Sequence, residues 1–462
     1  MANLDFSNTA LSPELIENIA SLGYQQMTPI QAQSLPAIIE GKDVIAQGKT
    51  GSGKTAAFGL GLLHHLNVKR FRVQAMVLCP TRELADQVAK EIRKLARSIH
   101  NIKVLTLCGG TPTGSQIGSL EHGAHIIVGT PGRIEDHLRK GRLNLDELKT
   151  LVLDEADRML EMGFEDALDL IFSLCPAKRQ NLLFSATFPK QIQPITEHIM
   201  KDPLMVKVES KHDHSTITQH FYQVDNEEER VLAVEKLLMA NQPESAVIFC
   251  NTKIETQAVT RTLKNIGFSC AALNGDLEQR DRDQTLICFA NKSVHVLVAT
   301  DVAARGLDVD NLDMVINYQL AHDPEIHVHR IGRTGRAGDK GMACTLMSHK
   351  EAHKAIKLEE YLGISIEAED LSELVIENSS IKEASMVTIN IDGGKKQKLR
   401  PGDILGALTG NKAIRGDQIG KIQISAIAAF VAVERKIADL AVKTIMNGKL
   451  KGKKFRARKL IL

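Results

Sequence analysis

The stretch DVIAQGKTGSGKTAAFGLGLLHHL, residues 43–66, sets the fold of the first part of the chain. It begins as a short apolar strand, passes through a glycine-rich turn and ends in a helical pattern. The turn matches G-x-x-x-x-G-K-[ST], in which backbone N–H groups and a helix N-terminus face a phosphate. We therefore predict a phosphate loop in which Gly48, Gly51 and Gly53 let the backbone curl around the anion.

Charged and hydroxyl side chains add the groups that a bound nucleoside triphosphate needs. Lys54 is placed to reach the β- and γ-phosphates, and Thr55 is placed to offer its hydroxyl to Mg²⁺. About a hundred residues later, LVLDEAD (151–157) ends an apolar strand in acids. Alone, such acids are more often a solvated strand end. Together with the phosphate loop they predict Asp154 as the metal ligand and Glu155 as the base that polarises the attacking water.

Strands and helices alternate in two successive parts of the chain, and the strands are near-continuous apolar runs. This pattern predicts two doubly wound α/β lobes, each with a parallel sheet covered on both faces by helices. The first lobe is expected at 1–208 and the second at 218–370, with linkers at 209–217 and 371–385. Residues 386–462 change to strand–helix–strand–strand–helix–strand, which predicts a small βαββαβ domain.

Charge is divided unevenly along the chain. Residues 386–462 hold 17 Lys and Arg against five Asp and Glu, a net charge of +12, whereas the first 385 residues carry a net charge of −10. A basic block of this size predicts a polyanionic partner. The alternative is a solubilising tail, which the strand and helix patterns in the same block disfavour.

The cysteines and the apolar runs bear on the compartment. Seven cysteines are dispersed, which is typical of a reducing environment, not of a disulfide framework. The N-terminal residues lack the pattern of a signal peptide, and no apolar run approaches the roughly 18–20 residues of a membrane-spanning helix. These features predict a cytoplasmic protein without a membrane partner.

D-E-A-D at 154–157 resembles the signature of the DEAD-box RNA helicases, and further motifs of that family follow in order. They are GYQQMTPIQ (23–31), PTRELA (80–85), GG (109–110), TPGR (130–133), SAT (185–187), VIFCNT (247–252), ATDVAARGLD (299–308) and HRIGRTGR (329–336). The resemblance covers roughly residues 6–360. It implies two RecA-like lobes, ATP and Mg²⁺ as cofactors, and local ATP-dependent unwinding of RNA between lobes that close and reopen.

The resemblance also implies how the nucleotide is recognised. Gln31 would read the edge of adenine, because a carboxamide matches the adjacent donor and acceptor of that base. Tyr24 would stack on the base with Phe6 nearby, and Asp308 would meet the ribose. Met27 stands where the family usually has proline, a departure that leaves Gln31 in place.

Catalytic roles follow in the same way from the family motifs. Ser185 and Thr187 would link the nucleotide state to the grip on RNA. Arg333 and Arg336 would reach the γ-phosphate from the second lobe as arginine fingers. The predicted catalytic residues are Lys54, Glu155, Ser185, Thr187, Arg333 and Arg336.

Small hydroxyls, glycine amides and arginines at family positions predict contacts to the RNA backbone that carry no base sequence. In the lobes these positions are Arg82, Gly110, Thr130, Arg133, Thr252, Arg282 and Thr300. The βαββαβ domain resembles an RRM-like fold, yet its central strand has Phe430 as its one aromatic, so base stacking on the sheet is not expected. The candidate contacts there are basic: Lys395, Lys396, Lys398, Lys451, Lys453, Lys454, Arg456 and Arg458.

A DEAD-box core followed by such a domain resembles the bacterial DbpA group. That resemblance implies a monomer acting on structured RNA, namely large-subunit ribosomal RNA or a pre-ribosomal particle during ribosome assembly. Three alternatives remain at this point: an ATP-gated RNA clamp without productive unwinding, a DNA helicase, and a C-terminal domain that binds protein instead of nucleic acid.

Overall fold

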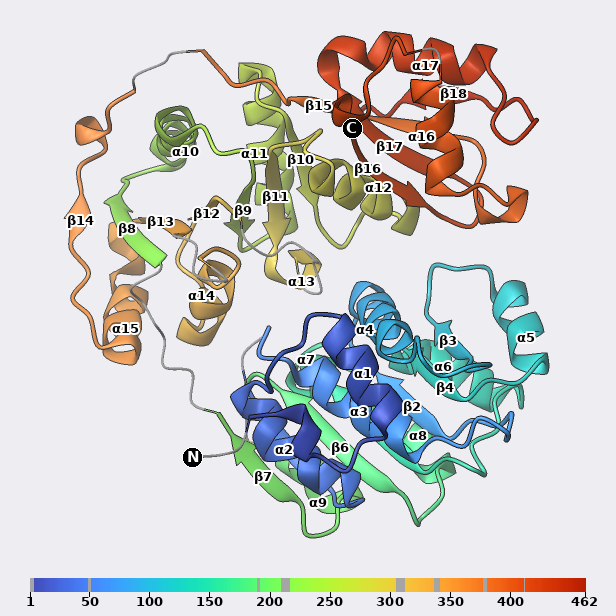
Figure 1. The fold of residues 1–462 in the computed structure, drawn as a ribbon. Helices are drawn as coiled ribbons and strands as arrows, with labels where there is room; N and C mark the ends of the chain where they lie inside the picture. The colour runs from blue at the N-terminus through green and yellow to red at the C-terminus, as the bar shows by residue number, and fades with distance from the viewer. Residues whose placement is uncertain are drawn as a thin grey trace. The chain divides into compact units, whose positions relative to one another are not determined.

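The computed structural model describes residues 4–48, 51–188, 192–208, 217–304, 312–335, 341–376, 380–410 and 412–462. The chain divides into two units, Met1–His212 and Asp213–Leu462. The first unit holds one seven-stranded sheet, and the second holds a seven-stranded and a four-stranded sheet (Figure 1). The predicted fold class, two parallel-sheet lobes and a small βαββαβ domain, is confirmed. In the described ranges, no helix combines the length and the apolar character needed to cross a membrane.

The first lobe is a parallel sheet with the strand order β3-β4-β2-β5-β6-β1-β7. The strands are β1 (Val44–Gln47), β2 (Ala75–Leu78), β3 (Val104–Leu107), β4 (Ile126–Gly129), β5 (Thr150–Asp154), β6 (Gln180–Ser185) and β7 (Leu204–Lys207). The helices are η1 (Phe6–Asn8), α1 (Pro13–Ser21), α2 (Pro29–Ile39), α3 (Lys54–His65), α4 (Arg82–Leu95), α5 (Thr113–Glu121), α6 (Pro131–Arg139), α7 (Ala156–Glu161), α8 (Glu165–Leu174) and α9 (Gln193–Ile199).

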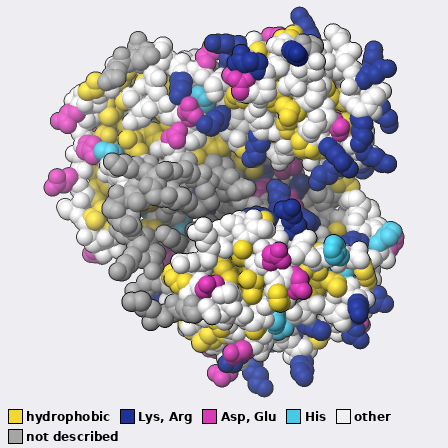
Figure 2. Space-filling model, in the orientation of Figure 1, with side chains coloured by type: hydrophobic (Ala, Val, Ile, Leu, Met, Phe, Trp, Pro, Cys, Tyr) yellow, Lys and Arg dark blue, Asp and Glu magenta, His cyan; other side chains and the backbone are white. Residues whose placement is uncertain are grey.

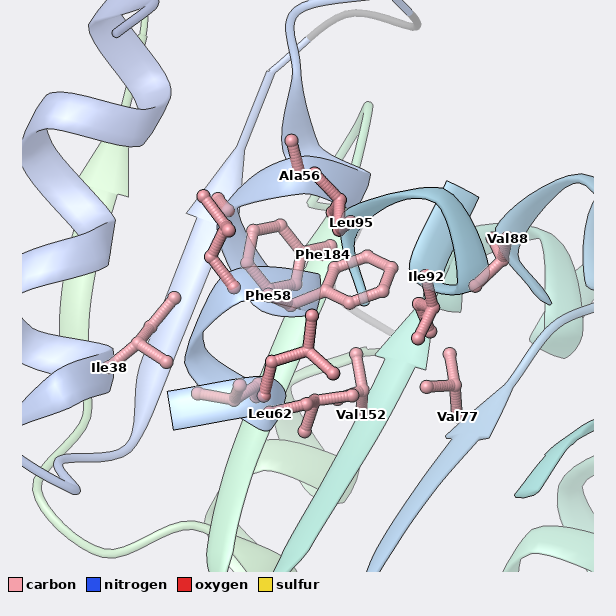
Figure 3. Packing of buried hydrophobic residues seen from close by; sticks show 14 of the residues in the cluster. Ile38, Ala56, Phe58, Leu62, Val77, Val88, Ile92, Leu95, Val152 and Phe184 are labelled. Carbon is pink, nitrogen blue, oxygen red and sulfur yellow. The ribbon is translucent and has the colours of Figure 1, made fainter. Parts of the chain in front are cut away.

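Two apolar clusters cover the two faces of this sheet. Helices α1–α4 pack on one face and α6–α9 on the other, so residues of one strand alternate between the clusters. Phe58 of α3 and Phe184 of β6 lie at the centre of the first cluster with ring centroids 5.1 Å apart, beside Leu62 and Val152 (Figure 3). Burial on both faces is why the strands read as continuous apolar runs.

The second lobe repeats this plan with the parallel order β10-β11-β9-β12-β13-β8-β14. Its strands are β8 (Ile217–Gln223), β9 (Ala246–Cys250), β10 (Cys270–Leu273), β11 (Val296–Thr300), β12 (Met314–Asn317), β13 (Gly341–Met347) and β14 (Ala368–Glu369). Its helices are α10 (Glu227–Asn241), α11 (Lys253–Ile266), α12 (Gln279–Ala290), α13 (Asp301–Ala304), α14 (Pro324–Ile331), η4 (His349–Glu351), α15 (Ala352–Leu362) and η5 (Leu371–Glu373).

The two predicted linkers differ from each other in the structure. In the first, residue 217 begins β8, and 209–216 lie outside the described residues. In the second, Ile381 packs against the apolar cluster beneath α10 and α11, and Lys382 pairs with Glu244 at 3.7 Å. Part of the segment predicted as a linker is therefore attached to the second lobe.

The C-terminal domain follows the predicted element order and forms an antiparallel sheet in the order β16-β17-β15-β18. Its elements are β15 (Met386–Ile391), η6 (Lys395–Gln397), α16 (Pro401–Thr409), η7 (Gly416–Gln418), β16 (Ile419–Ile424), β17 (Ala429–Glu434), η8 (Arg435–Ile437), α17 (Ala438–Asn447) and β18 (Ala457–Lys459). Helices α16 and α17 cover one face of the sheet over a core of its own.

The other face of this sheet contacts the second lobe. Ile389 points toward the helices, so its neighbour Thr388 points the opposite way. Thr388 is fully buried, accepts a hydrogen bond from Asn291 Nδ2 at 3.1 Å and shares another with the Ser293 hydroxyl at 2.6 Å. Beyond β18, Leu460 packs against the apolar cluster that includes residues of α12 and α13. The second lobe therefore covers the face of β15 that points away from the helices.

The close approach of α2 and α3 makes a prediction about stability. An alanine Cβ at Gly61 would overlap the Cγ2 methyl of Ile38, whereas one at Gly118 in α5 would meet open space. Gly61→Ala should destabilise the first lobe by about 1 kcal/mol, because overpacking outweighs the gain in helix propensity. Gly118→Ala, the matched control, should stabilise it by up to about 1 kcal/mol. Native-state hydrogen exchange of the central strands measures both changes, and equal effects would contradict the packing argument.

Candidate nucleotide and nucleic-acid sites

Strand order brings the predicted phosphate and metal residues together. Strands β5, β6 and β1 are neighbours, and all are parallel, so their carboxyl ends meet at one edge of the sheet. Gln47 lies opposite Ser185, and Asp154 lies opposite Phe184. The Gly48 N–H donates to the Ser185 carbonyl oxygen at 3.0 Å. This edge is where open α/β sheets bind their ligands.

The phosphate loop leads directly into α3. Gly51 and Gly53 adopt φ values of +81° and +92°, in the left-handed region that favours glycine. Lys54, the first residue of α3, is buried, and its Nζ donates to the Gly48 carbonyl oxygen at 2.5 Å. Thr55 follows on the same turn of the helix. Residues 49 and 50 lie outside the described residues.

Several buried hydroxyls around the loop have no hydrogen-bond partner among the residues that the structure describes. They are Thr28 Oγ1, Ser52 Oγ and Ser185 Oγ. A buried polar group without a partner is costly, and such groups commonly meet a ligand or water. A Cβ at Gly53 would overlap the Gln31 side chain and lie 2.9 Å from Thr28 Oγ1, so the loop has no room for a larger residue. These residues fit a bound triphosphate.

Gln31 connects the N-terminal motif to the phosphate loop. It is 1% exposed; its Oε1 accepts from the Thr28 N–H at 2.9 Å, and its Nε2 donates to the Gly53 carbonyl oxygen at 3.0 Å. One amide hydrogen and one lone pair of the carboxamide stay available for a base. Tyr24 is half-buried; its hydroxyl donates to Glu91 Oε1 at 2.5 Å, and Phe6 is buried in the same apolar cluster.

The acids that end β5 occupy an unusual environment. Asp154 is 3% exposed, and burial together with the adjacent Glu155 raises its pKa to about 7, although Lys54 partly offsets the rise. A carboxylate of this kind is suited to a cation, which would stabilise its charge. Glu155 caps α7 with φ +54° and ψ +52°, a left-handed conformation that is uncommon for a residue with a side chain.

The last acid of the D-E-A-D motif has a role that the sequence reasoning missed. Asp157 is 1% exposed, and its Oδ2 accepts from the Thr187 hydroxyl at 2.7 Å and from the Thr187 N–H at 3.1 Å. Burial opposes ionisation of Asp157, yet the hydrogen bonds from Thr187 and the nearby Arg158 stabilise the carboxylate and lower its pKa. The acid motif and the S-A-T motif are thus joined directly. The sequence feature that could have indicated this contact is the third acid of the motif, three residues after Asp154.

The predicted RNA residues of the first lobe gather along the other half of the same edge. Strands β3, β4 and β2 are neighbours, and Gly110, Thr130 and Arg82 follow their carboxyl ends. Gly110 has φ +70°, Thr130 precedes α6, and Arg82 begins α4. Arg133, in the first turn of α6, donates to Thr113 Oγ1 at 3.0 Å. The strand order therefore separates predicted nucleotide residues from predicted RNA residues.

The second lobe shows the same grouping. Strands β10, β11 and β9 are neighbours; Thr300 is the last residue of β11, and Thr252 follows β9 as the N-cap of α11. The Thr252 hydroxyl and N–H donate to Glu255 Oε2, each at 2.9 Å. Arg282 of α12 donates to the Ala303 carbonyl oxygen at 2.7 Å, which ties α12 to α13.

Arg333 lies just after α14. In that helix, Arg330, to which the sequence motifs gave no role, forms a buried ion pair. Arg330 is 2% exposed and forms a two-pronged ion pair with Asp301, with both N–O distances at 2.7 Å. Arg330 also donates to Asn251 Oδ1 at 2.8 Å. The predicted finger Arg336 and the predicted ribose contact Asp308 lie outside the described residues.

The basic residues of the C-terminal domain fall into two groups. Lys and Arg side chains gather over this domain in Figure 2. Among the predicted RNA contacts, Arg458 pairs with Asp392 at 3.1 Å; Lys459, which is not one of them, pairs with Asp439 at 2.8 Å. The other predicted contacts are exposed, and within the described residues they have no acidic partner: Lys395, Lys396, Lys398, Lys451, Lys453, Lys454 and Arg456.

Hydrogen bonds to backbone carbonyl oxygens join these basic loops to each other and to a neighbouring turn. The Lys451 ammonium donates to the Lys398 carbonyl oxygen at 3.1 Å, so the loops before α16 and before β18 meet. The Lys395 and Lys396 N–H groups donate to carbonyl oxygens of the turn between β16 and β17, at 2.9 Å each. Phe430 is only 6% exposed, so its ring presents no stacking surface.

Three protein families match successive parts of the chain. The DEAD/DEAH box helicase family matches residues 28–195, the helicase conserved C-terminal domain matches 229–338, and the DbpA RNA binding domain matches 388–459. These ranges correspond to the two lobes and the C-terminal domain described above.

Two curated relatives align with this chain over nearly the whole length of both sequences. The chain is 53% identical to the ATP-dependent RNA helicase DbpA of Escherichia coli K12, over 97% of this chain and 98% of that protein. It is 35% identical to the ATP-dependent RNA helicase DbpA of Bacillus subtilis, over 98% and 99%. The solved structure of S. cerevisiae Dbp5 bound to RNA and ADP BeF3 covers 80% of this chain and 96% of its own, at 31% identity and a TM-score of 0.73. The chain therefore belongs to the DbpA group of DEAD-box ATP-dependent RNA helicases.

Proposed function

We propose that this helicase remodels large-subunit ribosomal RNA during ribosome assembly, and that the C-terminal domain selects the RNA while the two lobes process it. The observation that carries the division of labour is the group of exposed basic residues that lack acidic partners in the described C-terminal domain. The first 385 residues carry a net charge of −10, so the lobes have no strong general attraction for a polyanion. The ribosomal target itself rests on the resemblance to the DbpA group.

At the nucleotide site, side chains and backbone would share the work of holding the triphosphate. Gly48, Gly51 and Gly53 would present backbone N–H groups, and Lys54 would neutralise the β- and γ-phosphates. Thr55 and Asp154 would hold Mg²⁺, which when bound supplies positive charge to the transferring phosphoryl group.

Around that centre, four residues have distinct tasks. Glu155 would accept a proton from the attacking water. Its left-handed backbone conformation sets the direction in which its side chain leaves the main chain. Gln31 would read adenine with the donor and acceptor that its own hydrogen bonds leave available. Arg333 would stabilise charge on the γ-phosphate. Asp157 would hold Thr187 so that a change at the phosphates reaches the S-A-T segment.

Two substitutions separate nucleotide binding from hydrolysis. Lys54→Ala should abolish productive ATP binding, because the phosphates lose their buried cation. Glu155→Gln should bind ATP normally and slow hydrolysis by about 10²–10⁴-fold, because the amide keeps the shape of the side chain but no longer accepts the proton. Fluorescent-nucleotide titration and RNA-stimulated phosphate release measure the two steps. Wild-type turnover by Glu155→Gln would remove Glu155 from the role of base.

Substitutions in the full-length chain test the C-terminal surface without uncovering the second lobe. Removing residues 386–462 would expose Asn291 and Ser293, which contact Thr388, so a truncation would change the lobe as well as the charge. Lys396→Ala and Lys453→Ala avoid this complication. Both residues are exposed and lie far along the sequence from every residue assigned to the nucleotide site.

Each of these variants should bind structured RNA more weakly. The negative slope of log K against log salt should become less steep by about 0.7–0.9, which corresponds to the loss of one phosphate contact. Lys459→Ala is the matched control, because its ammonium already pairs with Asp439. Filter binding at several salt concentrations measures the slopes. Identical slopes for all three variants would place the RNA elsewhere.

Crosslinking followed by sequencing of the bound RNA tests the ribosomal target. RNA recovered from cells with the wild-type chain should be enriched in one region of large-subunit ribosomal RNA. The Lys396→Ala/Lys453→Ala double variant should lose that enrichment while keeping its ATPase activity on generic RNA. An unbiased RNA population from the wild-type chain would rule out this target.

A further inference from the structure

A buried polar pair in the first lobe lies directly behind the predicted RNA contacts. Gln116 of α5 is 5% exposed, and His137 of α6 is fully buried. His137 Nε2 and Gln116 Oε1 are 3.0 Å apart. Both side chains come from helices that follow the strands β3 and β4, whose carboxyl ends carry Gly110 and Thr130.

Both the nitrogen and the oxygen of the Gln116 carboxamide form hydrogen bonds. Its Nε2 donates to the Cys108 carbonyl oxygen at 2.8 Å and to the Thr111 hydroxyl, so both residues flanking the Gly109–Gly110 pair are attached to it. Its Oε1 must then accept from His137 Nε2. One amide side chain therefore connects the loop after β3 to helix α6.

The protonation state of His137 agrees with this arrangement. Burial and the nearby Arg133 lower the pKa of His137, so its ring is neutral near pH 7. Because Nε2 carries the proton that Oε1 accepts, Nδ1 is left as an acceptor, and it has no hydrogen-bond partner among the described residues. Among the described residues, the ring of His137 therefore hydrogen-bonds to Gln116 alone.

Arg133 closes the same arrangement from the outside. Its guanidinium donates to Thr113 Oγ1 at 3.0 Å and to the Thr111 carbonyl oxygen at 3.5 Å. The loop 108–113 is therefore held from within by Gln116 and from the surface by Arg133. A shift of this loop relative to α6 would break buried hydrogen bonds, which makes the spacing of the two stiff.

We propose that Gln116 and His137 are positioning residues that set the spacing between Gly110 on one side and Thr130 and Arg133 on the other, and so the affinity of the first lobe for an RNA backbone. The covalent backbone confines successive phosphates to a narrow range of separations, so contacts from two separate protein segments bind well only when the distance between the segments matches that range. The inference rests on the proposed RNA contacts of the first lobe and adds the residues that hold those contacts in place.

Gln116→Leu is the central test, because leucine fills the space but holds neither the loop nor His137. The RNA concentration for half-maximal ATPase activity should rise about tenfold, which corresponds to about 1.4 kcal/mol. The KM for ATP and kcat at saturating RNA should stay within about twofold, since the nucleotide residues are on β5, β6 and β1.

A matched control separates positioning from general loss of stability. Gln180 is also a buried glutamine; its Nε2 donates to two carbonyl oxygens, of Ile38 at 2.9 Å and Lys42 at 2.7 Å, and its Oε1 accepts from Thr150. It lies at the amino end of β6, at the opposite edge of the sheet from the loops. Gln180→Leu should lower the melting temperature as much as Gln116→Leu does, with no change in the RNA requirement. Equal changes in the RNA requirement would overturn the proposal.

Variants of His137 test the pair itself. His137→Leu should raise the RNA requirement as Gln116→Leu does, whereas His137→Gln, which offers a donor to Gln116 Oε1, should restore most of the affinity. The double variant Gln116→Leu/His137→Leu should be no worse than Gln116→Leu alone, because the two residues act in one chain of hydrogen bonds. Additive losses would contradict this.

Thr130→Val distinguishes the inference from the proposed RNA contacts on which it rests, because it removes a predicted contact and leaves the hold of Gln116 and Arg133 on the loop 108–113 in place. If Thr130→Val leaves the RNA requirement unchanged, the RNA contacts of this lobe are wrongly assigned. If Thr130→Val raises the requirement and Gln116→Leu does not, the contacts stand and the positioning role of Gln116 and His137 is wrong.

Discussion

The parallel register of β1, β6 and β5 is the constraint on which the first lobe depends. These strands are buried on both faces, so polar side chains have room only at their ends, and the register brings those ends to one edge. Gly48, Ser185 and Asp154 become neighbours although they are far apart in the sequence. The strands β2, β4 and β3 continue the same edge, which is why phosphate chemistry and the predicted RNA contacts share one sheet without sharing residues.

Buried polar contacts then join segments that the sheet alone leaves independent. Asp157 holds Thr187 in the first lobe, and Arg330 holds Asp301 in the second. Removing one partner of such a buried contact leaves an uncompensated charge, at a cost of about 3–5 kcal/mol for an ion pair. A buried hydrogen bond or ion pair of this kind has few alternative geometries. When one of the two joined segments moves, the other must therefore move with it or the contact breaks.

Much of this could be read from the sequence, and the remainder has a common physical cause. Apolar runs, the glycine-rich turn at 48–55 and the acids at 154–157 are local patterns that fix an element and its chemistry. Strand order is not local, so the neighbours of β1 could not be deduced. Gln116 and His137 looked like ordinary helix residues, because nothing nearby in sequence indicates that their side chains meet. The segment 371–385 looked like a linker because its polar composition concealed Ile381.

The C-terminal domain shows how a fold can keep its topology and change its binding surface. In an RRM-like sheet, the face opposite the helices binds bases through aromatic side chains. Here that face carries Thr388, buried against Asn291 and Ser293, while the ring of Phe430 is almost fully buried. An aromatic side chain on a face that packs against the second lobe would not be accessible to a base. The scarcity of aromatic residues on these strands agrees with this packing. The surface left for nucleic acid is the loops and edges of the domain. The predicted contacts there are lysines that have no acidic partner among the described residues, so phosphate contacts and RNA shape, more than base stacking, would discriminate one RNA from another.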